Sequence, residues 1–135
     1  GTGGTQAGLA AGVVEKGWRT EVIGISVARP NPRGREVVQS LVSELCHKAK
    51  LTVPDAIYFE DSYRFGGYGN YNGELLNFIQ SIVRQEALPL DPTYTGKAFF
   101  GMMDLIRKGR IPADSKVVFW HTGGLLNLQT AKEIS

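Results

Sequence analysis

The sequence is poor in the residues that build disulfides, metal sites and strongly charged surfaces. It has one cysteine, two histidines and a formal net charge of only +2 in 135 residues. The single cysteine, Cys46, excludes an internal disulfide and is typical of a reducing compartment. His47 and His121 are isolated in the sequence, so no metal-binding cluster is expected. The basic residues are scattered rather than clustered, which argues against a nucleic-acid-binding protein.

Long apolar runs are also missing. No segment could span a bilayer, and the chain has no charged-then-apolar leader. We therefore expect a cytoplasmic protein without membrane association. An initiator methionine is absent as well, and a glycine-rich loop opens the chain with no strand before it. From this we expect that the N-terminal portion of a longer protein is missing.

Glycine, by contrast, is abundant, and the first nine residues read GTGGTQAGL. Residues 10–16 are predicted to form a helix that follows this loop. Glycines let a backbone approach a ligand closely, and Thr2 and Thr5 add hydroxyl donors. At the start of a helix, unpaired N–H groups and the helix dipole attract anions. The loop therefore indicates a site for a phosphate or a carboxylate.

The loop does not fit the common nucleotide-binding patterns well. A P-loop requires Lys-Ser or Lys-Thr after the glycines, and neither is present. A dinucleotide-binding loop requires a third glycine where this chain has Gln6, and an acidic residue where it has Arg29. Because an arginine there could bind a 2′-phosphate, a non-catalytic NADP-binding domain stays open. A purely structural turn before a helix also stays open.

Hydrophobic periodicity divides the chain into alternating helices and strands. Strands are predicted at residues 21–28, 56–60 and 116–121, and further helices at residues 35–49, 74–86 and 97–108. Cys46 lies on the apolar side of the first of these three helices, so we expect it to pack in the core. The alternation predicts one α/β domain over residues 1–135, a three-layer αβα sandwich with a mostly parallel sheet.

Two loops after predicted strands carry glycine beside tyrosine or threonine. They lie at residues 66–69 and 122–124. Ligands of parallel sheets bind beyond the carboxyl ends of the strands. These loops, joined by the N-terminal loop if its own strand belongs to the same sheet, are therefore the expected ligand-binding face.

Residues 1–9 resemble the phosphate cup of pyridoxal-phosphate (PLP) enzymes of the tryptophan synthase β group, also called fold type II. Residues 67–69, 91–97 and 121–124 resemble the D-cysteine desulfhydrase and 1-aminocyclopropane-1-carboxylate (ACC) deaminase family, in the same order and at similar separations. The resemblance covers nearly the whole chain. It implies the C-terminal part of the large, PLP-binding domain, without its N-terminal part and without the small domain.

The resemblance also assigns roles to individual residues. Tyr68 and Tyr94 match two active-site tyrosines that work near the substrate and the cofactor ring. Thr95 and Thr122 match positions around the pyridine nitrogen and the ring face. The residues that would hold the cofactor phosphate are Gly1, Thr2, Gly3, Gly4 and Thr5. The alternative is that Tyr68 and Tyr94 are ordinary loop tyrosines with exposed hydroxyls.

The implied activity is that of a lyase or hydrolase acting on a small amino acid. One form is β-elimination from D-cysteine to pyruvate, sulfide and ammonia; the other is ring-opening deamination of ACC to 2-oxobutanoate and ammonia. Thr95 and Thr122 replace the glutamate and leucine usual in the deaminases, which favours the desulfhydrase side. A hydroxyl at the pyridine nitrogen supports a weaker electron sink than a carboxylate does. Residues 125–127 depart from the family pattern, so another substrate stays open.

The Schiff-base lysine of the family has no match in this chain. The resemblance places it upstream of residue 1, so we expect the 135-residue chain to be inactive by itself. We expect missing chain, or a partner chain, to cover the faces that a fragment leaves bare. A homodimer is also expected.

Overall fold

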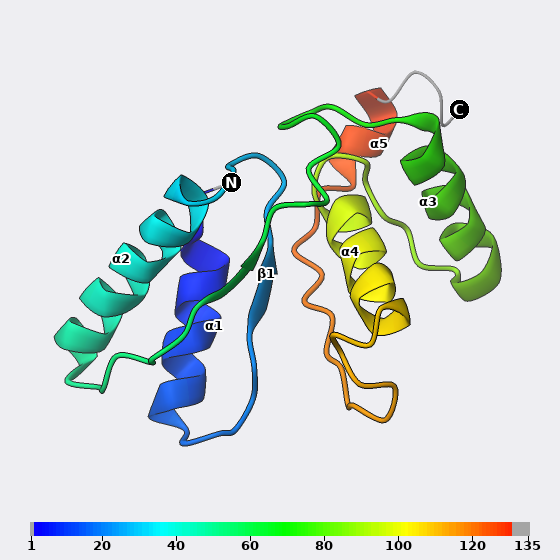
Figure 1. The fold of residues 1–135 in the computed structure, drawn as a ribbon. Coiled ribbons are helices and arrows are strands. Elements are labelled where there is room, and N and C mark those ends of the chain that lie inside the picture. The colour runs from blue at the N-terminus through cyan, green and yellow to red at the C-terminus, as the bar shows by residue number, and fades with distance from the viewer. Residues whose placement is uncertain (1, 131–135) are drawn as a thin grey trace. The chain divides into compact units, whose positions relative to one another are not determined.

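The computed structural model describes residues 2–130, which form two compact units (Figure 1). The first unit is Gly1–Asp61 and the second is Ser62–Ser135. The elements in chain order are α1 (Gly4–Glu15), β1 (Ile23–Ile25), α2 (Arg33–Ala49), β2 (Tyr58–Glu60), α3 (Gly73–Glu86), α4 (Thr95–Arg107) and α5 (Leu126–Thr130).

The first unit is built on a β-α-β arrangement. β1 and β2 pair in parallel, with Gly24 opposite Phe59, and α2 connects them. This confirms the predicted α/β class with a parallel sheet. Both strands are shorter than predicted, because only three residues of each find a hydrogen-bonded partner. The β-branched residues around β1 predicted a longer strand. Its pairing partner, β2, supports hydrogen bonding over only a short part of that segment.

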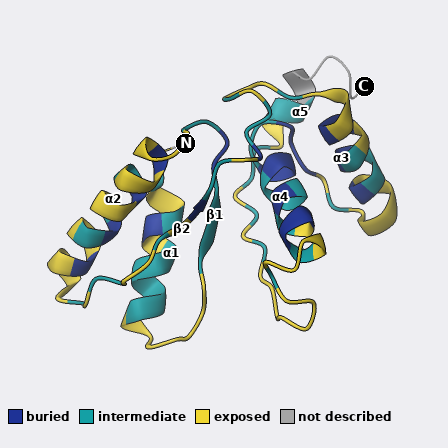
Figure 2. Cartoon of the chain, viewed as in Figure 1, coloured by how far each residue is buried: buried dark blue, intermediate teal, exposed yellow. Residues whose placement is uncertain are grey.

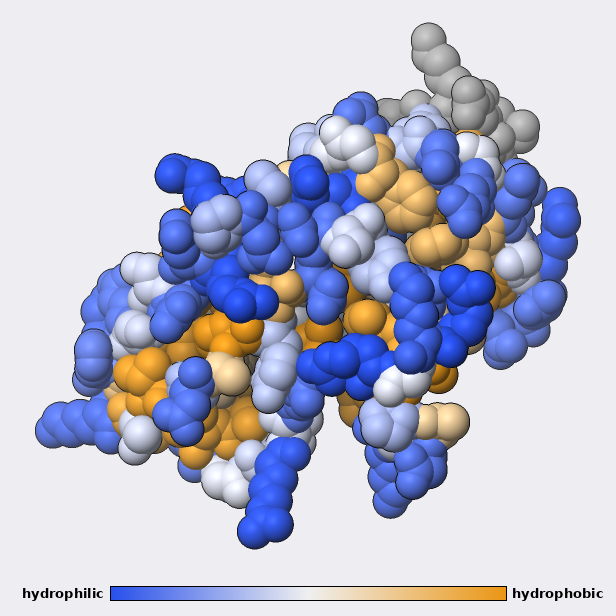
Figure 3. All heavy atoms as spheres, in the orientation of Figure 1, coloured by the Kyte–Doolittle hydropathy of each residue, from blue (hydrophilic) through white to orange (hydrophobic). Residues whose placement is uncertain are grey.

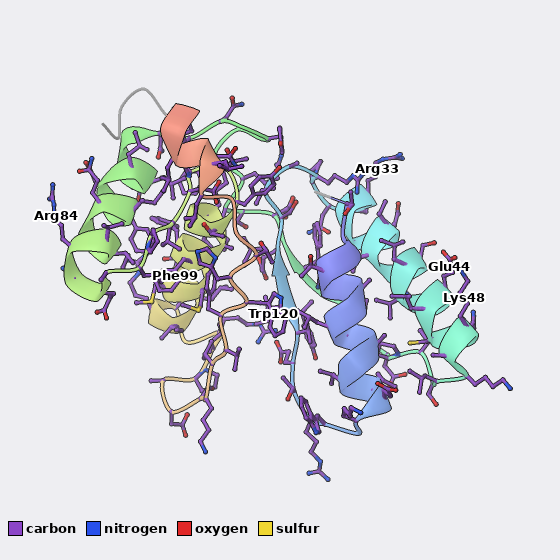
Figure 4. The ribbon with its side chains drawn as sticks, turned by 180° about the vertical axis from the view of Figure 1, so that it is seen from behind. Arg33, Glu44, Lys48, Arg84, Phe99 and Trp120 are labelled. Carbon is purple, nitrogen blue, oxygen red and sulfur yellow. The ribbon has the colours of Figure 1, made fainter. Side chains whose placement is uncertain are left out.

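Small and β-branched side chains form the core of the first unit. α1 and α2 pack on each other, and their buried sides appear dark in Figure 2. The buried cluster consists of Ala7, Val38, Val42, Cys46 and Phe59. Cys46 is fully buried, as predicted from its place on the apolar side of the helix. Outside this core, Glu44 and Lys48 form an exposed pair on α2, with 2.6 Å between Oε1 and Nζ (Figure 4).

Aromatic and aliphatic side chains form the core of the second unit. Leu75, Ile79 and Ile82 of α3 are buried with Leu90. The ring of Phe99, on α4, contacts rings from α3 and from the segment after α4 (Figure 4). α3 starts where the Asn72 side chain accepts a hydrogen bond from the N–H of residue 75 at 3.0 Å.

The predicted strand at residues 116–121 is wrong for the described structure. This segment forms no strand within residues 2–130. Its composition is typical of a strand, but strand formation requires a neighbour with which to exchange hydrogen bonds. The side chains of Val118 and Trp120 are 82% and 60% exposed. Apolar atoms reach the surface of both units in Figure 3, and none of the described helices is long and apolar enough to cross a membrane.

Candidate functional site

The glycine-rich loop becomes the first turn of α1. Gly3 adopts a left-handed backbone conformation with a φ of 89°, and the helix begins at Gly4, earlier than predicted. The Gly3 carbonyl accepts the N–H of Ala7 at 3.0 Å. No side chain caps this end of α1 and no acidic residue lies in its first turn. The first N–H groups of the helix therefore face outward with the positive end of the dipole.

The surroundings of this turn suit a phosphate. Thr2, Gly4 and Thr5 are exposed, so two hydroxyls and the helix N–H groups are available to a ligand. Arg29, which the sequence offered as a 2′-phosphate ligand, donates from Nη1 to the Thr2 carbonyl at 3.4 Å and brings a positive charge beside the turn. We call residues 2–5 the glycine cup. Gly1, the remaining predicted cup residue, lies outside the described residues.

In the second unit, the structure brings Tyr68 and Tyr94 together as a pair. Their hydroxyl oxygens are 2.6 Å apart, and their rings meet edge to face with centroids separated by 5.8 Å. Tyr68 is 62% exposed, whereas Tyr94 is half-buried. The hydrogen bond shared with Tyr68 raises the pKa of Tyr94, and burial and the charge of Asp91 act in the same direction. Tyr94 therefore holds its proton at neutral pH.

A buried carboxylate, Asp91, fixes the start of α4 and with it the backbone of Tyr94. Its Oδ2 accepts the N–H groups of Thr93 and Tyr94, each at 2.8 Å. Its Oδ1 accepts the N–H and the hydroxyl of Thr95, also at 2.8 Å. A carboxylate that accepts several N–H groups at a helix start neutralises orphan donors and complements the dipole. Asp91 was not predicted from the sequence to have a role of its own; its place just before the helix was the usable signal.

Thr95 and Thr122 lie in different environments. Thr95 is 2% exposed and its hydroxyl is engaged by Asp91, so in this conformation it supports the α4 start from within the protein. Thr122 is exposed and lies between His121, whose Nε2 is 3.0 Å from the Pro89 carbonyl, and the glycines that follow. The roles of both threonines beside a cofactor ring stay predictions.

The loop around Thr122 packs against the α4 start. A Cβ on Gly124 would lie 2.5 Å from Oδ1 of Asp91, so only glycine fits there without a shift. The amide of Asn127, in α5, donates to Oδ2 of Asp91 at 3.2 Å. Two predicted ligand loops of the second unit, at residues 66–69 and 122–124, thus both reach the start of α4.

Lys97, in the first turn of α4, is a further buried charge. Its side chain has no exposed surface, and its Nζ donates to the carbonyls of Arg64 at 2.8 Å and Gly67 at 2.7 Å. Burial lowers the pKa of Lys97, and the negative charge of Asp91 opposes this shift. Nothing in the apolar pattern indicated that this lysine points inward, because lysines are normally exposed.

The chain is similar to known proteins over most of its length. A protein of Bradyrhizobium sp. named 1-aminocyclopropane-1-carboxylate deaminase is 36% identical over 126 residues, covering 91% of this chain and 37% of that protein. A Pyrococcus abyssi protein provisionally named for the same activity is 42% identical over 131 residues, covering 93% of this chain and 37% of that protein. The chain thus spans little more than a third of the length of these curated relatives.

A solved structure and a family profile agree with these relatives. The crystal structure of an ACC deaminase homologue superposes with a TM-score of 0.88 at 36% identity, covering 95% of this chain and 38% of that one. The fold predicted from the sequence is therefore confirmed as a partial α/β domain of this kind. The profile described as "Pyridoxal-phosphate dependent enzyme" matches residues 1–123. The chain belongs to the family of pyridoxal-phosphate dependent enzymes.

Proposed function

We propose that this chain is the C-terminal part of the PLP-binding domain of a deaminase or lyase that acts on a small amino acid. The observation that carries the proposal is the hydrogen-bonded pair Tyr68 and Tyr94 in a chain of this family. Family membership favours PLP over the NADP alternative that the sequence left open. The chain spans little more than a third of the length of its relatives, which supports the expectation that it is part of a longer protein.

The glycine cup would bind the phosphate of PLP. The outward N–H groups of Gly4 and Thr5, the hydroxyls of Thr2 and Thr5, and the left-handed Gly3 supply donors without a competing carboxylate. When bound, PLP supplies the electron sink for bond changes at the substrate α-carbon. Lys97 is a poor candidate for the lysine that carries the cofactor, because it is buried and its ammonium is engaged by two carbonyls.

The two tyrosines would handle protons at the substrate. Tyr94 keeps its proton at neutral pH, so its hydroxyl is a proton donor rather than a base in the resting protein. Because its oxygen is 2.6 Å from that of Tyr68, a proton given up by one hydroxyl can be replaced from the other. The exposed Tyr68 is the member of the pair that solvent or substrate reaches more easily.

We propose β-elimination from D-cysteine as the preferred reaction and ACC deamination as the competing one. Thr95 replaces the glutamate usual in the deaminases, and its hydroxyl is held by Asp91. Because thiolate is a good leaving group, its elimination would need a weaker electron sink than the opening of a cyclopropane ring would. The relatives carry the deaminase name, so the test includes both substrates.

The experiment uses the complete protein that carries this chain, purified with PLP. Visible absorbance of bound cofactor, release of sulfide and pyruvate from D-cysteine, and release of 2-oxobutanoate from ACC are measured. Sulfide release supports the preferred reaction, and 2-oxobutanoate alone supports the competing one. A protein that binds no PLP, or that binds it and turns over neither substrate nor L-cysteine, contradicts the proposal.

Tyr94→Phe tests the role of the phenol. A positioned acid or base contributes about 10²–10⁴-fold to turnover, so kcat is expected to fall by at least about 10²-fold while PLP absorbance and thermal stability are kept. Tyr71→Phe, which removes a hydroxyl from the loop of Tyr68 in the same unit, is the matched control. Turnover of Tyr94→Phe equal to that of the control would remove Tyr94 from the site.

We further propose a cytoplasmic homodimer. Cys46 is free and buried, which is compatible with a reducing compartment. Light scattering on the complete protein measures its mass in solution. A monomeric mass at micromolar concentration would contradict the dimer.

A further inference from the structure

Lys97 links the two segments that carry the tyrosine pair. It lies in the first turn of α4, three residues after Tyr94, and its Nζ reaches the carbonyl of Gly67, the residue before Tyr68. A second bond from the same ammonium reaches the Arg64 carbonyl. One side chain therefore ties the loop of Tyr68 to the helix whose start holds Tyr94.

The loop that receives these bonds has a backbone that needs support. Phe65, Gly66, Gly67 and Gly69 all have positive φ, at 51°, 91°, 121° and 74°. Within the loop, the N–H of Gly67 donates to the Arg64 carbonyl at 3.0 Å and the N–H of Asn70 to the Gly67 carbonyl at 3.2 Å. These local turns fix the loop's own shape but not its position against α4. The bonds from Lys97 tie the Gly67 end of the loop to α4, beside the edge-to-face contact of Phe65 with Phe100 of α4.

A buried ammonium is costly unless its donors are matched. Taking a charge out of water raises its free energy, and here two carbonyl dipoles and the negative charge of Asp91 offset part of that cost. A leucine or methionine would fill the same volume without this cost. The ammonium is thus better explained by the bonds it makes than by packing.

We propose that Lys97 is a positioning residue that holds the hydroxyls of Tyr68 and Tyr94 in contact. It acts through the loop carbonyls and touches neither hydroxyl. Only the expected effect on turnover rests on the proposed function. The contact between the two tyrosines lies within the second unit and does not depend on that function.

The test is Lys97→Met, which keeps the length of the side chain and removes its donors. In the complete protein labelled with tyrosine carrying ¹³C throughout the ring, the ring C–H groups report Overhauser effects and Cζ reports titration, and Tyr68→Phe and Tyr94→Phe assign the signals of the two tyrosines. Lys97→Met is expected to abolish the ring-to-ring Overhauser effect and to lower the pKa of Tyr94 toward its ordinary value, as Tyr68→Phe does. Lys116→Met, which removes an exposed ammonium from the same unit, is expected to change neither.

Turnover supplies a readout that separates positioning from loss of fold. Since a displacement of about 1 Å costs on the order of 10²-fold, kcat of Lys97→Met is expected to fall by about that factor with little change in KM. A folded Lys97→Met protein with an unchanged Overhauser effect and unchanged Tyr94 titration overturns the proposal. If the protein binds no PLP, the proposed function fails, but the tyrosine signals still decide the role of Lys97.

A measurement on the unaltered protein covers the case in which Lys97→Met does not fold. An ammonium held by two carbonyls exchanges its protons slowly and lies close to the Arg64 and Gly67 backbone. Slow exchange with Overhauser contacts to both residues supports the proposal. Exchange as fast as that of Lys116 overturns it.

Discussion

Replacement of Asp91 by alanine gives the sharpest test of how the α4 start is held. In the folded state the carboxylate accepts three backbone N–H groups and one hydroxyl at 2.8 Å. Of these donors, the N–H and hydroxyl of Thr95 are buried, while Thr93 and Tyr94 are partly buried and water can replace the carboxylate there. Each buried donor left without an acceptor costs about 1–3 kcal/mol. We therefore expect Asp91→Ala to lower the free energy of unfolding by about 2–6 kcal/mol, from two buried donors.

Asp91→Asn separates the charge from the shape of the side chain. The amide keeps one oxygen for Thr95 but turns an NH₂ group toward the N–H groups of Thr93 and Tyr94, or the reverse. Only one side of the site can be satisfied, so a loss of about 1–2 kcal/mol is expected, smaller than for alanine.

The assay is urea unfolding of the full chain, followed by tryptophan fluorescence. The chain has two tryptophans, Trp18 in the first unit and Trp120 in the second. In a Trp18→Phe background, the signal of Trp120 reports on the unit that contains Asp91. Asp114→Ala, at an exposed aspartate of the same unit, is the control. A loss for Asp91→Ala within about 0.5 kcal/mol of the control, the range of ordinary surface substitutions, would refute the reasoning.

Two further outcomes follow from the second unit. A Cβ at Gly96 would lie 2.5 Å from Cδ1 of Ile79. Gly96→Ala is therefore expected to destabilise the unit by about 1–3 kcal/mol in the same urea assay. An unchanged urea midpoint would show that α3 and α4 can move apart without loss of stability. Bonds from Lys108 and Arg107 hold the pKa of Asp104 well below its ordinary 3.8. Because the folded-state pKa is depressed, this stabilisation is present above about pH 4 and is lost as the pH falls below it. Between about pH 2 and 7, acidification should therefore lower the Tm of Asp104→Asn less than it lowers the Tm of the unaltered protein. Identical pH profiles of Tm would contradict this expectation.

The sequence was sufficient for elements whose apolar residues repeat at helical spacing. Val38, Val42 and Cys46 of α2 are buried as their spacing predicted, and α3 and α4 begin within two residues of the expected positions. The length and number of strands were overestimated because a β-branched composition shows only that a segment can adopt the strand conformation. It does not show whether a neighbouring strand is present to pair with it. The segment at residues 116–121 has the composition of a strand without the partner.

The buried charges could not be found in the same way. Asp91 and Lys97 are both fully buried, yet a charged residue near a helix start reads as part of a solvated face. Their burial depends on carbonyls and N–H groups of the loops around them, and such backbone partners leave no mark in side-chain patterns. The tyrosines were found because a family resemblance marked them, and the structure adds what holds them together.

Gly3 connects the glycine cup with the interior of the first unit. A Cβ on this residue would lie 2.9 Å from Cγ2 of Val38, a core residue of α2 with 2% of its surface exposed. The surface beneath the glycine cup is therefore hydrocarbon rather than polar at this point. A change of side-chain shape at Val38 would therefore alter both the core packing of the first unit and the backbone of the glycine cup at Gly3. Substitutions chosen to raise thermal stability and substitutions chosen to strengthen ligand binding at the cup would compete at this one position.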